Sequence, residues 1–156
     1  MAIEIENKYL VNTFLWNSKL ASKSYVIRQA YMHSDPSKTI RVRTKGLKGF
    51  ITVKGKNTGA ARAEFEYEIP LSDAIEMIHT FCSNVIEKTR YEVEFAGKCW
   101  EVDVFEGDNE GLIIAEIELN SETEAYELPL WVKENVTADM RYANSNLAAH
   151  PYKKWD

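Results

Sequence analysis

Three ionic side chains near the amino terminus have a spacing that suits joint chemistry. Glu4, Glu6 and Lys8 occupy alternate positions, with uncharged residues between them. Because successive side chains of a β-strand point to opposite faces, this spacing predicts that all three share one face of a strand. Two carboxylates and an ammonium group in register suit a site that holds a hard divalent cation together with a phosphate.

The same alternation recurs in later segments of the chain, and several of these segments carry charges of one sign. A strand face in water also alternates in this way. Such a face usually mixes lysine with glutamate, whereas here whole strands are cationic or acidic. The cationic positions are Arg41, Arg43, Lys54, Lys88 and Arg90, and the acidic positions are Glu64, Glu66, Glu68, Glu101, Asp103, Glu116 and Glu118.

Charges sorted in this way predict a site for a metal-bound polyphosphate. Guanidinium groups match phosphate oxygens in a bidentate manner and lysine supplies point charges, so the cations suit a linear anion of several phosphates. The carboxylate pairs Glu4/Glu6 and Glu116/Glu118 suit Mg²⁺ or Mn²⁺, which prefer oxygen ligands. The alternative is a set of ion pairs that bind nothing. It is the weaker interpretation, because buried ion pairs alone stabilise a fold poorly.

The elements that position these residues are mainly strands. Alternation bounded by turn residues is the evidence for each strand. The predicted strands cover residues 3–10, 25–32, 38–45, 50–56, 61–70, 86–96, 99–106 and 112–119.

Three helices are also expected. The first follows Pro70, with Ser72 as its cap and an apolar stripe on one side. A capping box of Ser121 and Glu124 predicts a short second helix over residues 121–128. The third is expected over residues 138–149, with Thr137 as its cap.

These elements predict an α+β, mainly β fold: an eight-stranded antiparallel sheet that closes into a barrel, with flanking helices. Either face of the sheet can line the interior. An apolar interior would suit a lipocalin-like carrier, and a charged interior would form an ionic tunnel. The charged interior is favoured, because amphipathic helices need an apolar outer surface to cover.

Bulk composition narrows the class of protein. The 156 residues are expected to form a single domain over 1–156. A net charge of −5 argues against general binding to nucleic acid or to anionic membranes. The sequence has no signal-peptide pattern, no apolar run long enough to span a bilayer and no CxxC spacing. A cytoplasmic protein with reduced Cys82 and Cys99 is therefore expected.

The order of the ionic residues resembles the CYTH superfamily, also called the triphosphate tunnel metalloenzymes, over nearly the whole chain. Glu4, Glu6 and Lys8 match its ExExK signature. The resemblance implies an eight-stranded antiparallel tunnel that hydrolyses or cyclises triphosphates with Mg²⁺ or Mn²⁺. The other matching residues are Gln29, Tyr31, Arg41, Arg43, Lys54, Glu66, Glu68, Lys88, Arg90, Asp103, Glu116, Glu118, Asp139, Arg141, Tyr142, Asn144 and Leu147.

The resemblance also implies roles for individual residues. The acidic motif of the fifth strand is met equally by Glu64/Glu66 or by Glu66/Glu68. The implied metal ligands are Glu4, Glu6, Glu116 and Glu118, with Glu68 and Asp103 as further ligands. The implied substrate ligands are Lys8, Arg41, Arg43, Lys54, Lys88 and Arg90. Catalytic roles are implied for Glu4, Glu6, Lys8, Tyr31, Lys88 and Asp103.

The short bacterial members of that family, which this chain resembles most, are inorganic triphosphatases that cleave tripolyphosphate to pyrophosphate and phosphate. This activity is therefore the favoured expectation, with a small-molecule triphosphate as partner and a monomer or homodimer as the assembly. Two alternatives stay open. One is a class IV adenylyl cyclase, whose His-Phe segment is not evident near His33. The other is a polyphosphate-binding module without catalysis.

Overall fold

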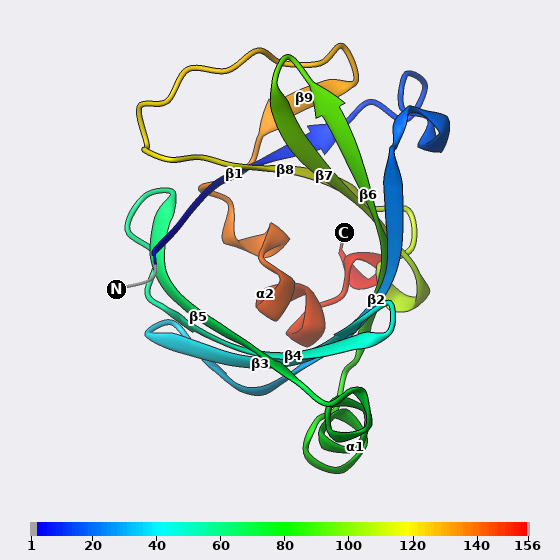
Figure 1. Ribbon diagram of the computed structural model, residues 1–156, viewed down its shortest axis with the longest axis vertical. Helices are drawn as coiled ribbons and strands as arrows, with labels where there is room; N and C mark the ends of the chain where they lie inside the picture. The colour runs from blue at the N-terminus through cyan, green and yellow to red at the C-terminus, as the bar shows by residue number, and fades with distance from the viewer. Residues whose placement is uncertain (1–2, 156) are drawn as a thin grey trace.

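Strands dominate the structure, a computed structural model that describes residues 3–155 (Figure 1). Each of the eight predicted strands is present within a few residues of its expected bounds, and a short ninth strand follows them. The helices among these residues are α1 (Leu71–Phe81) and α2 (Asn144–Ala149). The strands are β1 (Ile3–Val11), β2 (Lys23–Asp35), β3 (Lys38–Lys45), β4 (Lys48–Gly55), β5 (Ala61–Ile69), β6 (Ile86–Phe95), β7 (Lys98–Phe105), β8 (Ile113–Glu118) and β9 (Val132–Asn135).

The sheet closes on itself. Its antiparallel order is β5-β4-β3-β2-β6-β7-β8-β1, and β1 also pairs with β5, so the first eight strands form a complete ring (Figure 1). The closing ladder is short, with the register pairs Ile3↔Ala63, Glu4↔Arg62 and Ile5↔Ala61. β9 extends the sheet from β1 outside the ring. The predicted eight-stranded antiparallel barrel is confirmed.

Many apolar side chains of the strands face outward and are covered by other parts of the chain. Behind β1, β7 and β8, the indole of Trp100 is fully buried against Tyr9 and Trp131, under the segment that connects β8 to β9 (Figure 1). On another side, Ala74 and Ile78 of α1 are buried against the outer faces of β2 and β3. The outward face of the sheet therefore supplies most of the apolar core, as the amphipathic helices led us to expect.

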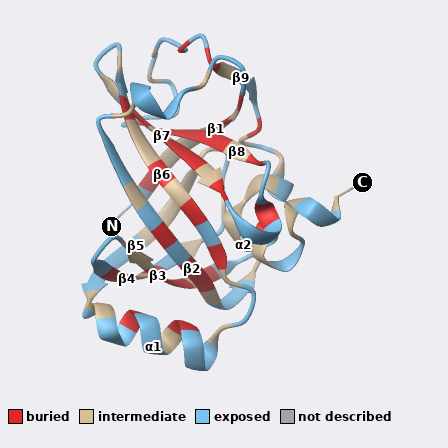
Figure 2. Ribbon diagram, turned by 90° about the vertical axis from the view of Figure 1, so that its right-hand side faces the viewer, coloured by how far each residue is buried: buried red, intermediate tan, exposed pale blue. Residues whose placement is uncertain are grey.

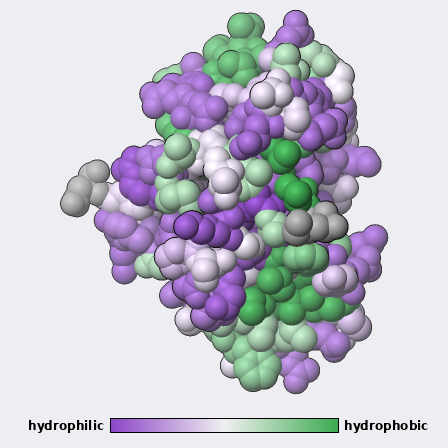
Figure 3. Space-filling model, turned by 90° about the vertical axis from the view of Figure 1, so that its left-hand side faces the viewer, coloured by the Kyte–Doolittle hydropathy of each residue, from purple (hydrophilic) through white to green (hydrophobic). Residues whose placement is uncertain are grey.

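Helix α1 lies very close to β4. A Cβ atom at Gly49 would lie 2.8 Å from the Cβ atom of Ala74 and 3.1 Å from the carbonyl oxygen of Ile69. Only a residue without a side chain fits there. Among residues 3–155, no helix covers the side of the barrel formed by β1 and β5 (Figure 1), and apolar surface is exposed on that side (Figure 3). Phe65 of β5 is 40% exposed.

One end of the barrel interior is apolar, and α2 closes it. Leu147 of α2 is fully buried in a cluster with Ile86, Phe105 and Ile114, which lie on the inner faces of their strands. Seen along the barrel, α2 lies within the ring of strands (Figure 1); from the side it lies at one end (Figure 2). The ionic part of the interior is thus a tunnel blocked at this end.

The helix predicted over residues 121–128 is a wrong prediction. Residues 121–128 form a turn and then irregular chain, although the carboxylate of Glu124 does accept a hydrogen bond from the Asn120 amide, at 2.6 Å. Tertiary contacts hold this segment instead: Glu122 accepts a hydrogen bond from the Ala60 amide, and Glu124 forms an ion pair with Lys98.

The carboxyl-terminal helix is shorter than expected. A 3₁₀ turn at Met140–Tyr142, capped by Asp139, precedes α2, which begins only at Asn144. Thr137 does not cap it; its hydroxyl accepts a hydrogen bond from the Lys8 amide at 2.9 Å. Helix α1 begins at Leu71 without a side-chain cap, so Ser72 is not its cap either. Neither α-helix within residues 3–155 has the length and apolarity needed to cross a bilayer.

Candidate active site

The barrel encloses a cavity of about 270 Å³ whose walls are mostly ionic. Each inner wall comes from the alternate positions that carry charge in the sequence. The cationic lining residues are Lys8, Arg41, Arg43, Lys45, Lys54, Arg62, Lys88 and Arg90. The acidic lining residues are Glu4, Glu6, Glu64, Glu66, Glu101, Glu116, Glu118 and Asp139.

Most of the predicted site residues meet in this cavity. All six predicted phosphate ligands line it, as do Tyr31 and the four main predicted metal ligands. Two predicted residues do not line it. Glu68 lies on an exposed part of β5, with its carboxylate 3.8 Å from the ammonium of Lys48. Asp103 is fully buried behind the cavity wall. On β5 it is therefore Glu64 and Glu66 that face the cavity.

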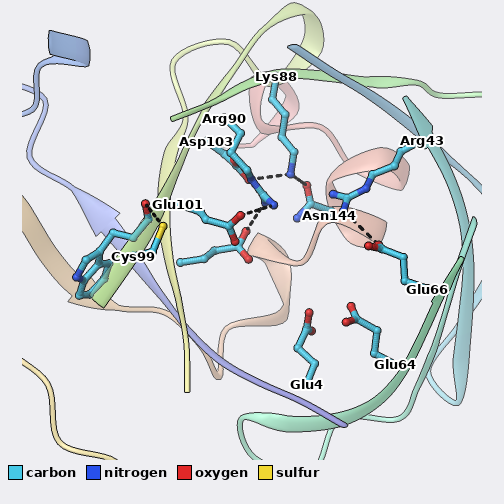
Figure 4. Close-up of polar contacts among 12 residues, drawn as sticks. Glu4, Arg43, Glu64, Glu66, Lys88, Arg90, Cys99, Glu101, Asp103 and Asn144 are labelled. Atoms are coloured by element: carbon cyan, nitrogen blue, oxygen red, sulfur yellow. Dashed lines mark hydrogen bonds and ion pairs between the residues drawn. The ribbon is translucent and has the colours of Figure 1, made fainter. Parts of the chain in front are cut away.

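One cationic wall is built on β3. The guanidinium group of Arg43 lies 3.2 Å from one oxygen of Glu66 (Figure 4). The guanidinium group of Arg41 lies 3.4 Å from the same oxygen, which also accepts a hydrogen bond from Thr52 at 2.8 Å. Burial, with repulsion by Arg41 and Arg90, lowers the pKa of Arg43 to about 10. The buried Nε atoms of Arg41 and Arg43 have no hydrogen-bond partner among residues 3–155. This wall has more positive charge and more donors than the protein itself satisfies.

The second cationic wall is built on β6, around Asp103. The carboxylate of Asp103 accepts hydrogen bonds from Lys88 at 2.7 Å and from two nitrogens of Arg90, each at 2.8 Å. Although burial opposes its ionisation, Arg90 and Lys88 hold the pKa of Asp103 below its usual range. Both oxygens are thus in use within the protein. Asp103 is placed to orient two cations, and its predicted roles as a metal ligand and a catalytic group do not fit this position.

Helix α2 contributes to this wall through Asn144. The side-chain oxygen of Asn144 accepts a hydrogen bond from Lys88 at 3.1 Å (Figure 4) and another from Gln29, also at 3.1 Å. Burial, together with repulsion by Arg90, lowers the pKa of Lys88 to about 8, despite the attraction of Asp103. The element that closes the tunnel therefore also fixes the ammonium of Lys88.

Carboxylates crowd the part of the cavity formed by β1 and β8. Glu6 and Glu118 are cross-strand neighbours in this ladder. Burial, with repulsion by Glu116 and Glu4, raises the pKa of Glu6 well above its usual value. Burial, with repulsion by Glu4 and Glu101, likewise raises the pKa of Glu118. This concentration of negative charge is unfavourable by itself and would be relieved by a bound cation.

Glu116 differs from these two carboxylates. Although burial opposes its ionisation, Lys8, Arg90 and Lys88 hold the pKa of Glu116 well below its usual range. One guanidinium nitrogen of Arg90 lies 3.6 Å from a Glu116 oxygen. Glu116 is therefore ionised at neutral pH, and it lies between the acidic region and the cationic wall of β6.

A lysine links the remaining carboxylates. The ammonium of Lys54 donates to both oxygens of Glu4, at 2.9 and 3.2 Å, and lies 3.4 Å from Glu64. The carboxylates of Glu4 and Glu64 point toward the same part of the cavity (Figure 4). Burial and the neighbouring Glu4 raise the pKa of Glu64 to about 7, whereas Lys54 keeps the pKa of Glu4 low in spite of burial.

The whole chain is similar to known proteins in sequence and in structure. A family model described as the CYTH domain matches residues 2–152. The chain belongs to the CYTH domain family. It is 47% identical over 156 residues to an inorganic triphosphatase of Acetivibrio thermocellus, a match that covers 99% of each chain. It is 35% identical over 150 residues to an inorganic triphosphatase of Nitrosomonas europaea, covering 93% of this chain and 96% of the relative.

A solved structure of an inorganic triphosphatase has the same fold. It shares 33% sequence identity with this CYTH domain, the match covers 95% of each chain, and the TM-score is 0.67. The barrel, the ionic cavity and the family are therefore consistent with one another.

The chemistry of the acidic region fits a divalent cation. Its possible ligand atoms are all carboxylate oxygens. The carboxylates of Glu6 and Glu118 form no ion pair with any residue of 3–155. Within those residues, no three His, Cys, Asp or Glu side chains already converge on one point as metal ligands. Mg²⁺ commonly takes only one or two carboxylates and completes its shell with waters and substrate phosphates. The arrangement suits that kind of binding.

Sequence reasoning missed several lining residues of this CYTH domain. Lys45 lines the cavity, although its ammonium stacks on the ring of Tyr25, 4.6 Å from the centroid. Thr52 takes part through its bond to Glu66, and its place two positions before Lys54, on the same face of β4, was a usable signal. Arg141, in contrast, pairs with Asp139 in the exposed 3₁₀ turn and does not line the cavity.

Proposed function

We propose that this protein hydrolyses inorganic tripolyphosphate to pyrophosphate and phosphate with the help of Mg²⁺ or Mn²⁺. The observation that supports this most directly is the pairing of two cationic walls with an acidic region inside one closed barrel. The relatives named inorganic triphosphatase, which align over nearly the whole chain, support the same reaction.

The cationic residues hold the substrate. Arg41 and Arg43 bind phosphoryl oxygens from the β3 wall, and Lys88 and Arg90 bind them from the β6 wall. Lys8 lies between this anion and the acidic region. Because these donors are fixed and partly shielded from water, they stabilise the charge that develops on the phosphoryl oxygens in the transition state.

Glu4, Glu6, Glu116 and Glu118 hold the divalent ion. When bound, such an ion supplies charge neutralisation of the triphosphate and a lowered pKa for a coordinated water. Tyr31, which lines the same cavity, orients the phosphoryl group that is attacked. Asp103 acts only indirectly, by holding Lys88 and Arg90 in place.

The lining favours a bare polyphosphate over a nucleotide. A nucleoside base normally binds against apolar or aromatic side chains, and the lining of this cavity is dominated by ionic groups. Helix α2 blocks the apolar end of the interior, so the surface there is not open to a base. We therefore place ATP second as a substrate and do not favour the cyclase reaction.

Phosphate release from tripolyphosphate, with Mg²⁺, with Mn²⁺ and with EDTA, tests the proposal. We expect release only with a divalent ion, and a loss of about 100-fold or more in kcat for Glu116→Gln, a size typical of removing one group that stabilises the transition state. Binding of tripolyphosphate without any release would support a non-catalytic module instead. The formation of cyclic AMP from ATP at a comparable rate would support the cyclase.

A further inference from the structure

The link between Lys54 and Glu4 bears directly on how a cation enters this site. Lys54 lies on β4, Glu64 is its cross-strand neighbour on β5, and Glu4 lies on β1 across the closing ladder of the barrel. The ammonium contacts both oxygens of Glu4, at 2.9 and 3.2 Å, and one oxygen of Glu64 at 3.4 Å. Glu4 and Lys54 are largely buried, with side chains 11% and 15% exposed.

We propose that Lys54 is an internal counter-cation that occupies part of the metal position. In the metal-free protein its ammonium neutralises Glu4 and Glu64. A divalent ion that binds Glu4 displaces the ammonium, which is then free to contact the triphosphate. This inference rests on the proposed function, because it takes Glu4 to be a metal ligand.

Two properties of the site favour such an exchange. An ammonium that donates to both oxygens of Glu4 lies on the side from which a single ion could bind both oxygens, so only their remaining lone pairs are open. An ammonium and a divalent cation on the same carboxylate also repel each other strongly when solvent is largely excluded. The lack of a ready three-carboxylate site within residues 3–155 agrees with a Glu4 that is held by another partner.

The freed lysine would already be close to the anion. Along β4, Lys54 lies two positions from Thr52, which donates to the same Glu66 oxygen that Arg41 and Arg43 contact. Lysine has a flexible four-carbon stem and a point charge, so it can change partner without a change in the backbone. Bound metal would therefore raise the affinity of the protein for triphosphate. By thermodynamic linkage, bound triphosphate would raise its affinity for metal by the same factor.

Metal binding alone, measured without substrate, tests this inference. The EDTA-stripped protein is titrated with Mn²⁺, and free Mn²⁺ is followed by electron paramagnetic resonance. We expect Lys54→Met to bind Mn²⁺ about fivefold or more tightly than the unaltered protein, a size in the usual range of coupling between sites. The matched control is Lys45→Met, which removes the same charge from the cavity lining but frees no carboxylate. Its affinity should change less than about twofold, since an unpaired charge acts there only through screened, longer-range attraction.

The same experiment defines the contrary outcomes. Equal gains in Lys54→Met and Lys45→Met would mean that only net charge matters, and weaker Mn²⁺ binding in Lys54→Met would mean that Lys54 supports the site; either result overturns the inference. If Lys54→Met does not fold, Lys54→Gln is titrated in its place, because it keeps a hydrogen-bond donor and removes the charge.

A second measurement approaches the exchange from the anion side. In metal-free buffer, tripolyphosphate binding is measured by calorimetry for Glu4→Gln and for Glu118→Gln. Both variants remove one negative charge, but only the first releases Lys54, so Glu4→Gln should gain about fivefold more affinity. Equal gains would contradict the inference. Neither readout involves turnover, so a protein that binds Mn²⁺ as described and releases no phosphate refutes the proposed function alone.

Discussion

Asp103 and the two cations that it bridges form the most deeply buried ionic group of the tunnel. The side chains of Asp103, Lys88 and Arg90 are 0%, 1% and 9% exposed. Charges at such depth are tolerated only when they are paired and hydrogen-bonded. The single carboxylate therefore carries a structural task, which is to hold two positive groups side by side in front of the substrate.

Loss of that carboxylate should be costly. Asp103→Asn leaves the buried Lys88 without its ion-pair partner and leaves Arg90 with only its longer contacts to Glu101 and Glu116. We expect a loss of about 3–5 kcal/mol in the free energy of unfolding, as for other broken buried ion pairs. Denaturant unfolding measures this. Pyrophosphate should restore part of the loss, because it supplies the missing negative charge. Glu101→Gln is the control: its carboxylate contacts Arg90 at 3.2 Å but is 29% exposed, and its cost should be about 1 kcal/mol or less.

The lowered pKa of Lys88 predicts a pH dependence. In the folded protein Lys88 loses its proton as the pH rises through about 8, whereas its ordinary value is 10.5. Between these values the unfolded chain holds more protons, so this group makes folding more favourable as the pH rises. Anion binding should follow the opposite course, because an uncharged Lys88 attracts phosphate less.

Pyrophosphate affinity at pH 7 and pH 9 checks the prediction for Lys88. At each pH, the affinity of the unaltered protein is divided by that of Lys88→Met, so that the effect of protonation of pyrophosphate itself cancels. We expect this ratio to fall as the pH rises. A constant ratio across that range would show that Lys88 keeps its charge.

At the scale of elements, α1 packs tightly on β4 at Gly49. Gly49→Ala would bring its new methyl group to 2.8 Å from the Cβ atom of Ala74. Overpacking of this kind typically costs about 1–3 kcal/mol, and thermal unfolding would record it. The control is Gly55→Ala on the same strand, where the nearest atom, the Cβ atom of Ala63, lies at an ordinary 3.5 Å. Similar losses in both variants would contradict this account.

Alternation in the sequence predicted the eight strands and divided most of them into a charged and an apolar face, because a period of two follows directly from strand geometry. The amphipathic helices then indicated that the charged face lies inward. It did not predict how far along the tunnel each inward-facing side chain lies. Glu64, Glu66 and Glu68 share one face of β5, but register places Lys54 opposite Glu64 and Phe50 opposite Glu68, and only the first two glutamates face the cavity. Depth depends on register between strands, which the sequence pattern does not contain.

Local sequence patterns did not predict the contacts between segments that are distant in the chain. The capping box at Ser121 is a sound helix signal, but Glu122 bonds instead to the turn between β4 and β5. The strand β9 has only four residues and pairs with β1 through Tyr9↔Asn135 and Val11↔Val132, so no alternation revealed it. Asn144 meets Lys88 only because α2 folds back over the end of the barrel.

At the scale of the whole molecule, the barrel has one weak junction. β1 and β5 share three register pairs, whereas β2 and β3 share eight. Short ladders open more readily, because fewer hydrogen bonds and contacts must be lost together. We predict that backbone amides of residues 61–63 exchange with deuterium faster than those of residues 41–43, as measured by mass spectrometry of peptides. Equal protection at the two places would show that the closed ring opens only as a unit.

The position of β1 in the ring has a consequence for biosynthesis. Of the strands of the barrel, β1 is synthesised first, yet its partners are β5, β8 and β9, and Lys8 pairs with Glu116. At roughly 5–20 residues per second of translation, the strand waits roughly 5–20 seconds for β8 to be made. During this delay, its carboxylates and lysine keep it hydrated and discourage association with other nascent chains. The charges that line the folded tunnel thus also reduce aggregation of β1 before its partner strands are synthesised.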